Sequence, residues 1–268
     1  MPERERTKPF VTTPDTTHPE DLVLPVHARG NALLTRDRVF DHRKAGNIII
    51  FPFELASLNT TSYDARLGVH YYREQQFKGS RAVLEPFSEA SVRRYWGQPQ
   101  EAVNAQEWMK ENGPLEHISS QDRLIVIGPG ETILAHTFEF IGGRNCVSTE
   151  MRARSSMGRI GITVCKCAGW GDLGYVNRWT MEMTNHLSDL TVVLPAGMRV
   201  AQLIFYQVDP LQGQTYAQEA GKYQTTDDVA EMIRSWKPDD MIPKLYRDRD
   251  IGHFHEHHEL PPYSSEVA

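Results

Sequence analysis

The sequence has few cysteines, no long apolar run and no excess of positive charge. Its three cysteines, Cys146, Cys165 and Cys167, form no even disulfide framework, and the last two lack CxxC spacing. No segment approaches the roughly 20 apolar residues of a membrane-spanning helix, and the first thirty residues carry no apolar signal core. A net charge of −6 gives no electrostatic support for binding nucleic acid or an anionic membrane. We therefore expect reduced thiols and a cytoplasmic location.

Two common catalytic motifs are also missing. The GPGE stretch at 128–131 has no lysine, so it is not a Walker A loop. His257-His258-Glu259, in the His-rich end of the chain, matches the HxE of zinc nucleobase deaminases, but the PCxxC that should follow is absent. A run of histidines does not by itself provide the three or four placed ligands of a zinc site. We expect adventitious metal binding there, or none.

What the chain has is a series of short β-rich segments. Between residues 47 and 210 these segments are separated by glycine, proline and asparagine, with few helices between them. With 268 residues and 40% hydrophobic side chains, a sizeable core can form. The pattern predicts an all-β barrel or sandwich, interrupted at 88–120 by a segment with one helix near 103–112.

Two further helices are expected at the edges of this region. The first lies between Thr35 as N-cap and Gly46 as the C-terminal stop. The second begins after Thr226 as the cap and ends before Pro238. Its apolar residues follow the i, i+3, i+4, i+7 spacing of an amphipathic helix: Val229, Met232, Ile233 and Trp236.

Two carboxylates, Asp172 and Glu182, lie ten residues apart in AGWGDLGYVNRWTME. Strand alternation puts Trp179, Met181 and Met183 on one face and leaves Glu182 on the polar face. Taken alone, Glu182 is more often a solvated strand residue than a catalytic one, and Asp172 more often a turn residue than a base.

An Arg, Ser and Gly cluster lies in MRARSSMGRIG at 151–161. Arginine forks, hydroxyls and unobstructed backbone amides suit phosphate oxygens. A plain turn is an equally good interpretation of this segment on its own.

Six segments in order resemble the dCTP deaminase branch of the dUTPase superfamily. They are RKAGNIIIFPF with NTTSYDARLG, RSSMGRIG, AGWGDLGY, TMEMTN, PAGMRVAQLIF and GKYQ. The resemblance covers residues 33–230. It implies a distorted jelly-roll β-barrel with a few peripheral helices, assembled as a homotrimer whose sites are shared between neighbouring subunits. Residues 1–32 are then a flexible arm, and 231–268 a C-terminal helix and tail.

The resemblance also implies roles for individual residues. Glu182 would be the deaminating acid/base, with Ser155 and Arg159 completing the catalytic set. The substrate-binding residues would be Arg154, Ser156, Ala168, Asp172, Tyr175, Lys222, Tyr223 and Gln224. The substrate would be dCTP or dUTP with Mg²⁺ on its triphosphate, no zinc would be needed, and dTTP is a candidate effector.

The two acids leave the chemistry open. Zinc-free deamination needs one buried glutamate to move protons between water, the ring and the departing amine. Pyrophosphate cleavage needs an in-line water, which an aspartate beside the sugar can position. Because hydrolase-only relatives usually have an apolar residue at the Glu182 position, we expect deamination of dCTP to dUTP. The alternatives are a bifunctional enzyme that continues to dUMP, a dUTPase, and a nucleotide-binding regulatory protein without turnover.

This sequence departs from the family pattern at several places, three of them between residues 165 and 178. Gly171 replaces a usual Ile, Asn177-Arg178 replaces a usual Gly-His, and Cys165-Lys166-Cys167 replaces a usual His-x-Thr. These differences affect the turn and the side of the site that would contact the base.

Overall fold

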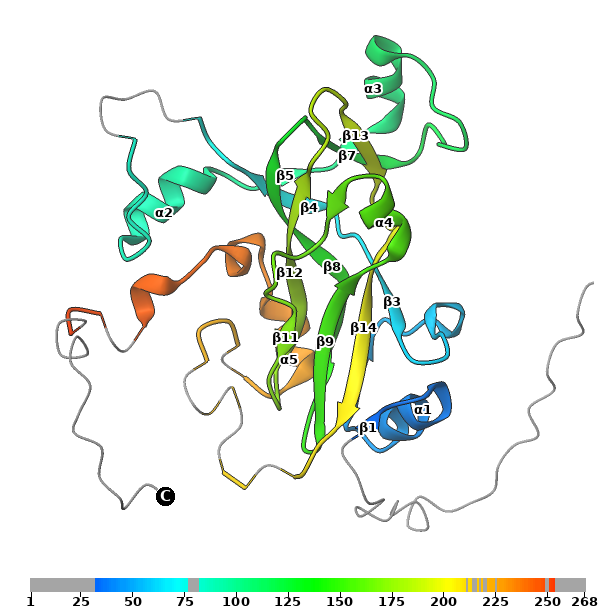
Figure 1. The fold of residues 1–268 in the computed structure, drawn as a ribbon, viewed down its shortest axis with the longest axis vertical. Helices are drawn as coiled ribbons and strands as arrows, with labels where there is room; N and C mark the ends of the chain where they lie inside the picture. Colours follow the sequence, from blue (N-terminus) through cyan, green and yellow to red (C-terminus); the bar gives the residue numbers. More distant parts are fainter. Residues whose placement is uncertain are drawn as a thin grey trace, which may run out of the picture. The chain divides into compact units, whose positions relative to one another are not determined.

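The computed structural model of the chain describes residues 32–76, 82–210, 212–213, 216, 218, 221–224, 226–248 and 251–253 (Figure 1). Residues 1–31 of the predicted arm, and most of the His-rich tail, lie outside the described residues. Among the described residues, no helix is both apolar and long enough to cross a membrane.

The described residues form three antiparallel sheets with helices between and after their strands, so of the predicted all-β fold the mostly-β character is confirmed. The first sheet consists of β1 (Ala32–Leu33), β14 (Arg199–Gln207), β9 (Val147–Ala153) and β11 (Trp170–Gly171), with β3 (Tyr63–Arg66) also paired to β14. The second consists of β10 (Ile162–Thr163), β12 (Val176–Asn185), β8 (Thr132–Gly143), β4 (His70–Arg73) and β5 (Gln100–Glu101), with β2 (Ile48–Phe51) also paired to β8. The third consists of β13 (Val192–Pro195), β7 (Arg123–Ile127) and β6 (Val103–Asn104).

The helices lie between and after these strands. The α-helices are α1 (Arg36–Lys44), α2 (Glu89–Trp96), α3 (Ala105–Asn112), α4 (Ser155–Arg159) and α5 (Val229–Ser235). The 3₁₀ turns are η2 (Leu55–Ser57), η3 (Pro238–Met241) and η4 (Leu245–Arg247). The three helices expected from sequence are confirmed as α1, α3 and α5, whereas α2 and α4 were not expected.

The predicted cap of α5 is wrong by two residues. The N-cap is Asp228, whose carboxylate accepts hydrogen bonds from the backbone N–H groups of Ala230 and Glu231 at 2.8 and 3.2 Å. The Thr226 hydroxyl instead donates to the Glu231 carboxylate at 2.9 Å. Both residue types cap helices well, and Asp228 is the one adjacent to the first turn.

The long strand β12 has the alternation expected from its sequence. Trp179, Met181 and Met183 are 3%, 0% and 0% exposed, and they pack into the main core. Glu182 is on the other face, paired in register with Leu134 of β8. A register shift between Arg178 and Thr180 marks a bulge in this strand pair.

A smaller core packs α2 and the C-terminal segment, the described part of residues 222–247, against the second sheet. Its buried residues are Tyr72, Val92, Trp96, Leu134, Met241 and Ile242. These come from β4, α2, β8 and the end of η3, so elements far apart in sequence meet on the second sheet. The C-terminal segment, orange in Figure 1, is thereby held next to the strand that carries Glu182.

Candidate functional site

A cavity of about 400 Å³ lies on the face of β12 that carries Glu182. Its lining includes three carboxylates, Asp172, Glu182 and Asp240. Aromatic side chains make up much of the remaining wall: Trp96, Trp170, Tyr175, Trp179, Tyr216, Tyr223 and Trp236. An apolar, aromatic cleft with a few convergent polar groups is the usual form of a small-molecule site.

Glu182 is largely buried in this cavity. Burial raises the pKa of its carboxyl, and the backbone N–H of Lys166, which donates to Oε2 at 3.2 Å, partly opposes that shift. A carboxyl with a raised pKa holds a proton more readily near neutral pH than an ordinary glutamate does. The environment therefore suits proton transfer in both directions.

Asp172 is exposed, in the turn between β11 and β12. Its Oδ1 accepts a hydrogen bond from the Trp170 indole N–H at 3.2 Å, and its backbone carbonyl accepts from Tyr175 N–H at 3.0 Å. The turn passes through Gly174, whose φ of +89° favours glycine. The carboxylate is thus held at the cavity while remaining accessible.

The unusual Gly171 is explained by close packing. A Cβ at this position would lie 2.2 Å from Thr149 Oγ1 and 2.6 Å from the Trp179 ring. The turn that carries Asp172 can therefore sit against Trp179 only with glycine at 171.

Tyr175 and Ala168, two of the substrate-binding residues implied by the resemblance, also line the cavity. The Tyr175 ring meets Trp179 and Tyr216 edge-on, with ring centroids 5.5 and 5.2 Å apart. Burial raises the pKa of its phenol, so Tyr175 stays neutral and presents a flat, largely apolar wall.

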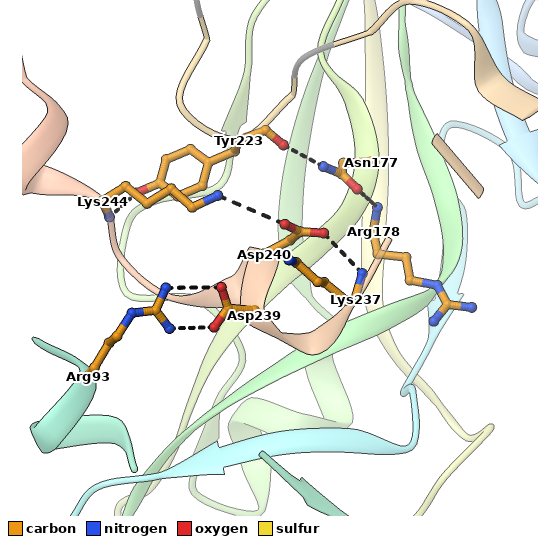
Figure 2. A network of polar contacts seen from close by, with 8 residues as sticks. All are labelled: Arg93, Asn177, Arg178, Tyr223, Lys237, Asp239, Asp240 and Lys244. Atoms are coloured by element: carbon orange, nitrogen blue, oxygen red, sulfur yellow. Dashed lines mark hydrogen bonds and ion pairs between the residues drawn. The ribbon is translucent and has the colours of Figure 1, made fainter. Parts of the chain in front are cut away.

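The segment at 221–224 is bonded to the start of β12. The buried Gln224 side chain accepts from Val176 N–H at 2.7 Å and donates to the Gly174 carbonyl at 2.9 Å. Asn177 donates to the Tyr223 carbonyl at 2.8 Å (Figure 2). Tyr223 lines the cavity, and Gln224 anchors the 221–224 segment to the start of β12. Lys222 pairs with Asp248 and lines a neighbouring cavity.

The Arg and Ser cluster lies outside this cavity in the single chain. Ser155, Ser156 and Arg159 are exposed on or beside α4. Arg154 forms an ion pair with Asp64 at 3.3 Å and donates to the Arg199 carbonyl at 3.1 Å. The structure thus gathers Ala168, Asp172, Tyr175, Glu182 and Tyr223, and leaves the four α4 residues apart.

Several cavity residues were not anticipated from sequence: Trp96, Trp170, Trp236, Asp240, Met241 and Pro243. Trp236 lies 4.6 Å from the His136 ring, and the Arg178 guanidinium lies 4.5 Å above its indole. His136 is buried and neutral, because burial lowers its pKa to about 3. The only sequence signal was the apolar stripe of α5, which ends at Trp236.

The described residues contain no group of three or more His, Cys, Asp or Glu side chains placed to hold a metal ion. Asp172, Glu182 and Asp240 line one cavity without forming such a group.

Comparison with known proteins gives consistent findings. Residues 33–208 match a family model described as dCTP deaminase-like. A Methanosphaerula palustris protein named "dCTP deaminase, dUMP-forming" is 28% identical over 187 residues, which cover 70% of this chain and 87% of that protein. A protein of the same name from Methanoculleus marisnigri is 27% identical over 172 residues, 64% of this chain and 79% of that one. A solved 2'-deoxycytidine 5'-triphosphate deaminase from Agrobacterium tumefaciens is similar with a TM-score of 0.47 and 16% identity, covering 67% of this chain and 49% of that chain.

Proposed function

Because this chain belongs to the dCTP deaminase-like family, we propose that it deaminates dCTP and carries the product on to dUMP and pyrophosphate. The observation that carries the proposal is that two carboxylates line the same aromatic cavity. Glu182 is largely buried and its pKa is raised, and Asp172 is accessible. The relatives named "dUMP-forming" favour this bifunctional outcome over release of dUTP.

In the deamination step, Glu182 acts on water. Its carboxylate takes a proton from water as the oxygen attacks C4 of cytosine, and the proton passes to N3. The carboxylate then takes the proton of the new C4 hydroxyl and delivers it to the amine, the C4–N4 bond breaks, and ammonia leaves as a carbonyl forms at C4. General acid/base catalysis of this kind contributes roughly 10²–10⁴-fold.

In the hydrolysis step, Asp172 acts at the sugar and phosphate end. It holds the deoxyribose 3′-hydroxyl and orients a water for in-line attack on the α-phosphorus. The bond between the α-phosphorus and the α,β-bridging oxygen breaks, and pyrophosphate leaves. Magnesium enters as part of the substrate, on its triphosphate, where it neutralises charge. The flat face of Tyr175 packs against the deoxyribose, and the Ala168 backbone meets the base edge.

We also propose that the α4 residues complete the site in a homotrimer. In this assembly, Arg154, Ser155, Ser156 and Arg159 of a neighbouring subunit approach the cavity and contact the phosphates and the reacting base. The sheets would then be the faces of a distorted jelly roll. Support comes from the separation of α4 from Glu182 within one chain, together with the exposure of its polar side chains.

The test is product analysis of Glu182→Gln beside the unchanged protein. With dCTP and Mg²⁺ the unchanged protein should release ammonia and dUMP, and a zinc chelator should make no difference. Glu182→Gln should lose ammonia release by about 10²-fold or more and still convert dUTP to dUMP. Glu107→Gln, an exposed glutamate on α3, is the matched control.

Three outcomes separate the alternatives. Accumulation of dUTP would restrict the enzyme to deamination. Activity on dUTP alone would make it a dUTPase. Tight binding of dCTP with no turnover of any pyrimidine nucleotide would refute catalysis and favour a regulatory protein.

A further inference from the structure

A second cavity, of about 300 Å³, adjoins the one that contains Glu182. The two share the lining residues Asn177, Tyr223, Trp236 and Asp240. Most of the second cavity is built from residues 222–247, which follow the region matched by the family model. Its chemistry is therefore a property of this chain's C-terminal segment.

The lining of this second cavity is rich in cations. It contains Arg93, Lys222, Lys237, Lys244 and Arg247, against the carboxylates Asp239 and Asp240. The cations come from α2, the 221–224 segment, η3 and η4, so the fold gathers them from separate elements. Such a cluster costs electrostatic free energy unless anions lie nearby.

Two of the five cations are neutralised by carboxylates. Arg93 forms a two-pronged ion pair with Asp239 at 2.5 and 3.1 Å and a further one with Glu89 at 2.8 Å, and the first is drawn in Figure 2. Lys222 pairs with Asp248. These two residues hold the segment in place and are not available to a ligand without breaking those pairs.

The other three cations are poorly compensated. Among the described residues, Lys237 and Arg247 have no carboxylate within ion-pair distance, and Lys244 reaches Asp240 only at 4.0 Å. Burial lowers the pKa of Lys244. The charges of Asp240 and Asp239 oppose that shift, and the charges of Arg247 and Lys237 add to it. An anion in this cavity would relieve that repulsion and offset the desolvation of the lysine.

We propose that Lys237, Lys244 and Arg247 form a binding site for an oligophosphate anion beside the catalytic cavity. Lysine and arginine recognise phosphate through charge-assisted hydrogen bonds, and three cations suit a chain of two or three phosphoryl groups. The phosphoryl groups belong either to the substrate's own triphosphate or to a separate phosphate-bearing ligand. Assigning them to the substrate rests on the proposed function, whereas affinity for oligophosphate does not.

The test is calorimetric titration with inorganic tripolyphosphate, using the full chain. The unchanged protein should bind it saturably, and Lys237→Gln/Arg247→Gln should bind at least about tenfold more weakly, since a hydrogen bond to a charged group contributes about 1.5–3 kcal/mol. Lys110→Gln on α3 is the matched control for loss of an exposed cation. Arg159→Gln, run in parallel, accounts for tripolyphosphate bound near α4. Melting temperatures report whether each variant folds.

Titration in the presence of saturating dCTP identifies the source of the phosphates, and it is done in the Glu182→Gln background without Mg²⁺ so that dCTP is not consumed. If the substrate's phosphates occupy the cavity, dCTP blocks tripolyphosphate binding and the double variant binds dCTP more weakly but dCMP as before. If a separate ligand occupies it, tripolyphosphate still binds beside dCTP. Equal binding by the unchanged protein and the double variant, or no saturable binding, would overturn the proposal. Because this readout needs no turnover, its result is independent of the deamination assay.

Discussion

Replacing Gln224 with alanine tests whether the C-terminal segment is an integral part of the site. Gln224 is 3% exposed, and its side chain satisfies both Val176 N–H and the Gly174 carbonyl. Each bond contributes about 1 kcal/mol net, and each backbone group left without a partner costs about 1–3 kcal/mol. Allowing for water that enters the space vacated by the side chain, we expect Gln224→Ala to lower the free energy of unfolding by about 2–4 kcal/mol.

Urea unfolding measures that loss, and Gln106→Ala on the exposed face of α3 is the control. Hydrogen exchange gives a local readout, because the Val176 amide should lose protection more than the amides of Met181 and Met183 in the same strand. Since Gly174 and Val176 flank Tyr175, substrate binding should weaken as well. A change in unfolding free energy below about 0.5 kcal/mol, with unchanged exchange at Val176, would refute the anchoring role.

Three further predictions concern the walls and the acid of the cavity. Gly171→Ala should destabilise the protein by about 1–3 kcal/mol, measured by thermal unfolding, because the new Cβ would collide with the Trp179 ring. Trp236→Ala should raise KM for dCTP more than it lowers kcat, since it removes a cavity wall and the contact with Arg178, itself a contribution of about 0.5–2 kcal/mol. The pH profile of deamination should fall on the acid side above the usual glutamate range, because Glu182 must start as a carboxylate and its pKa is raised. An acid limb at the usual glutamate value, an unchanged melting temperature or an unchanged KM would contradict the respective prediction.

Local patterns in the sequence were sufficient to predict much of β12, the strand that carries Glu182. The alternation of Trp179, Met181 and Met183 follows from the period of a β-strand, and this placed Glu182 on the opposite face. The helix at 229–235 was equally visible, because its apolar spacing is local.

Contacts across long sequence separations were not predictable in this way. Trp236 lies against His136 and Arg178, residues about a hundred and about sixty positions earlier, and no local period encodes such a meeting. Gly171 appeared as an unexplained departure from the family pattern until the positions of Thr149 and Trp179 were known. Asp240 gave no signal at all, because an aspartate after Pro238 and Asp239 is ordinary for the first turn of a helix.

The separation of α4 from the cavity has a consequence for mixtures of inactive variants. If Arg159 serves the Glu182 of a neighbouring copy, then Arg159→Gln chains and Glu182→Gln chains are defective in different halves of each site. Co-assembly of the two would create some sites with Glu182 from one copy and Arg159 from another, both intact. Activity would then return on mixing two dead proteins, in the manner of intragenic complementation, whereas sites built within one chain could never be rescued.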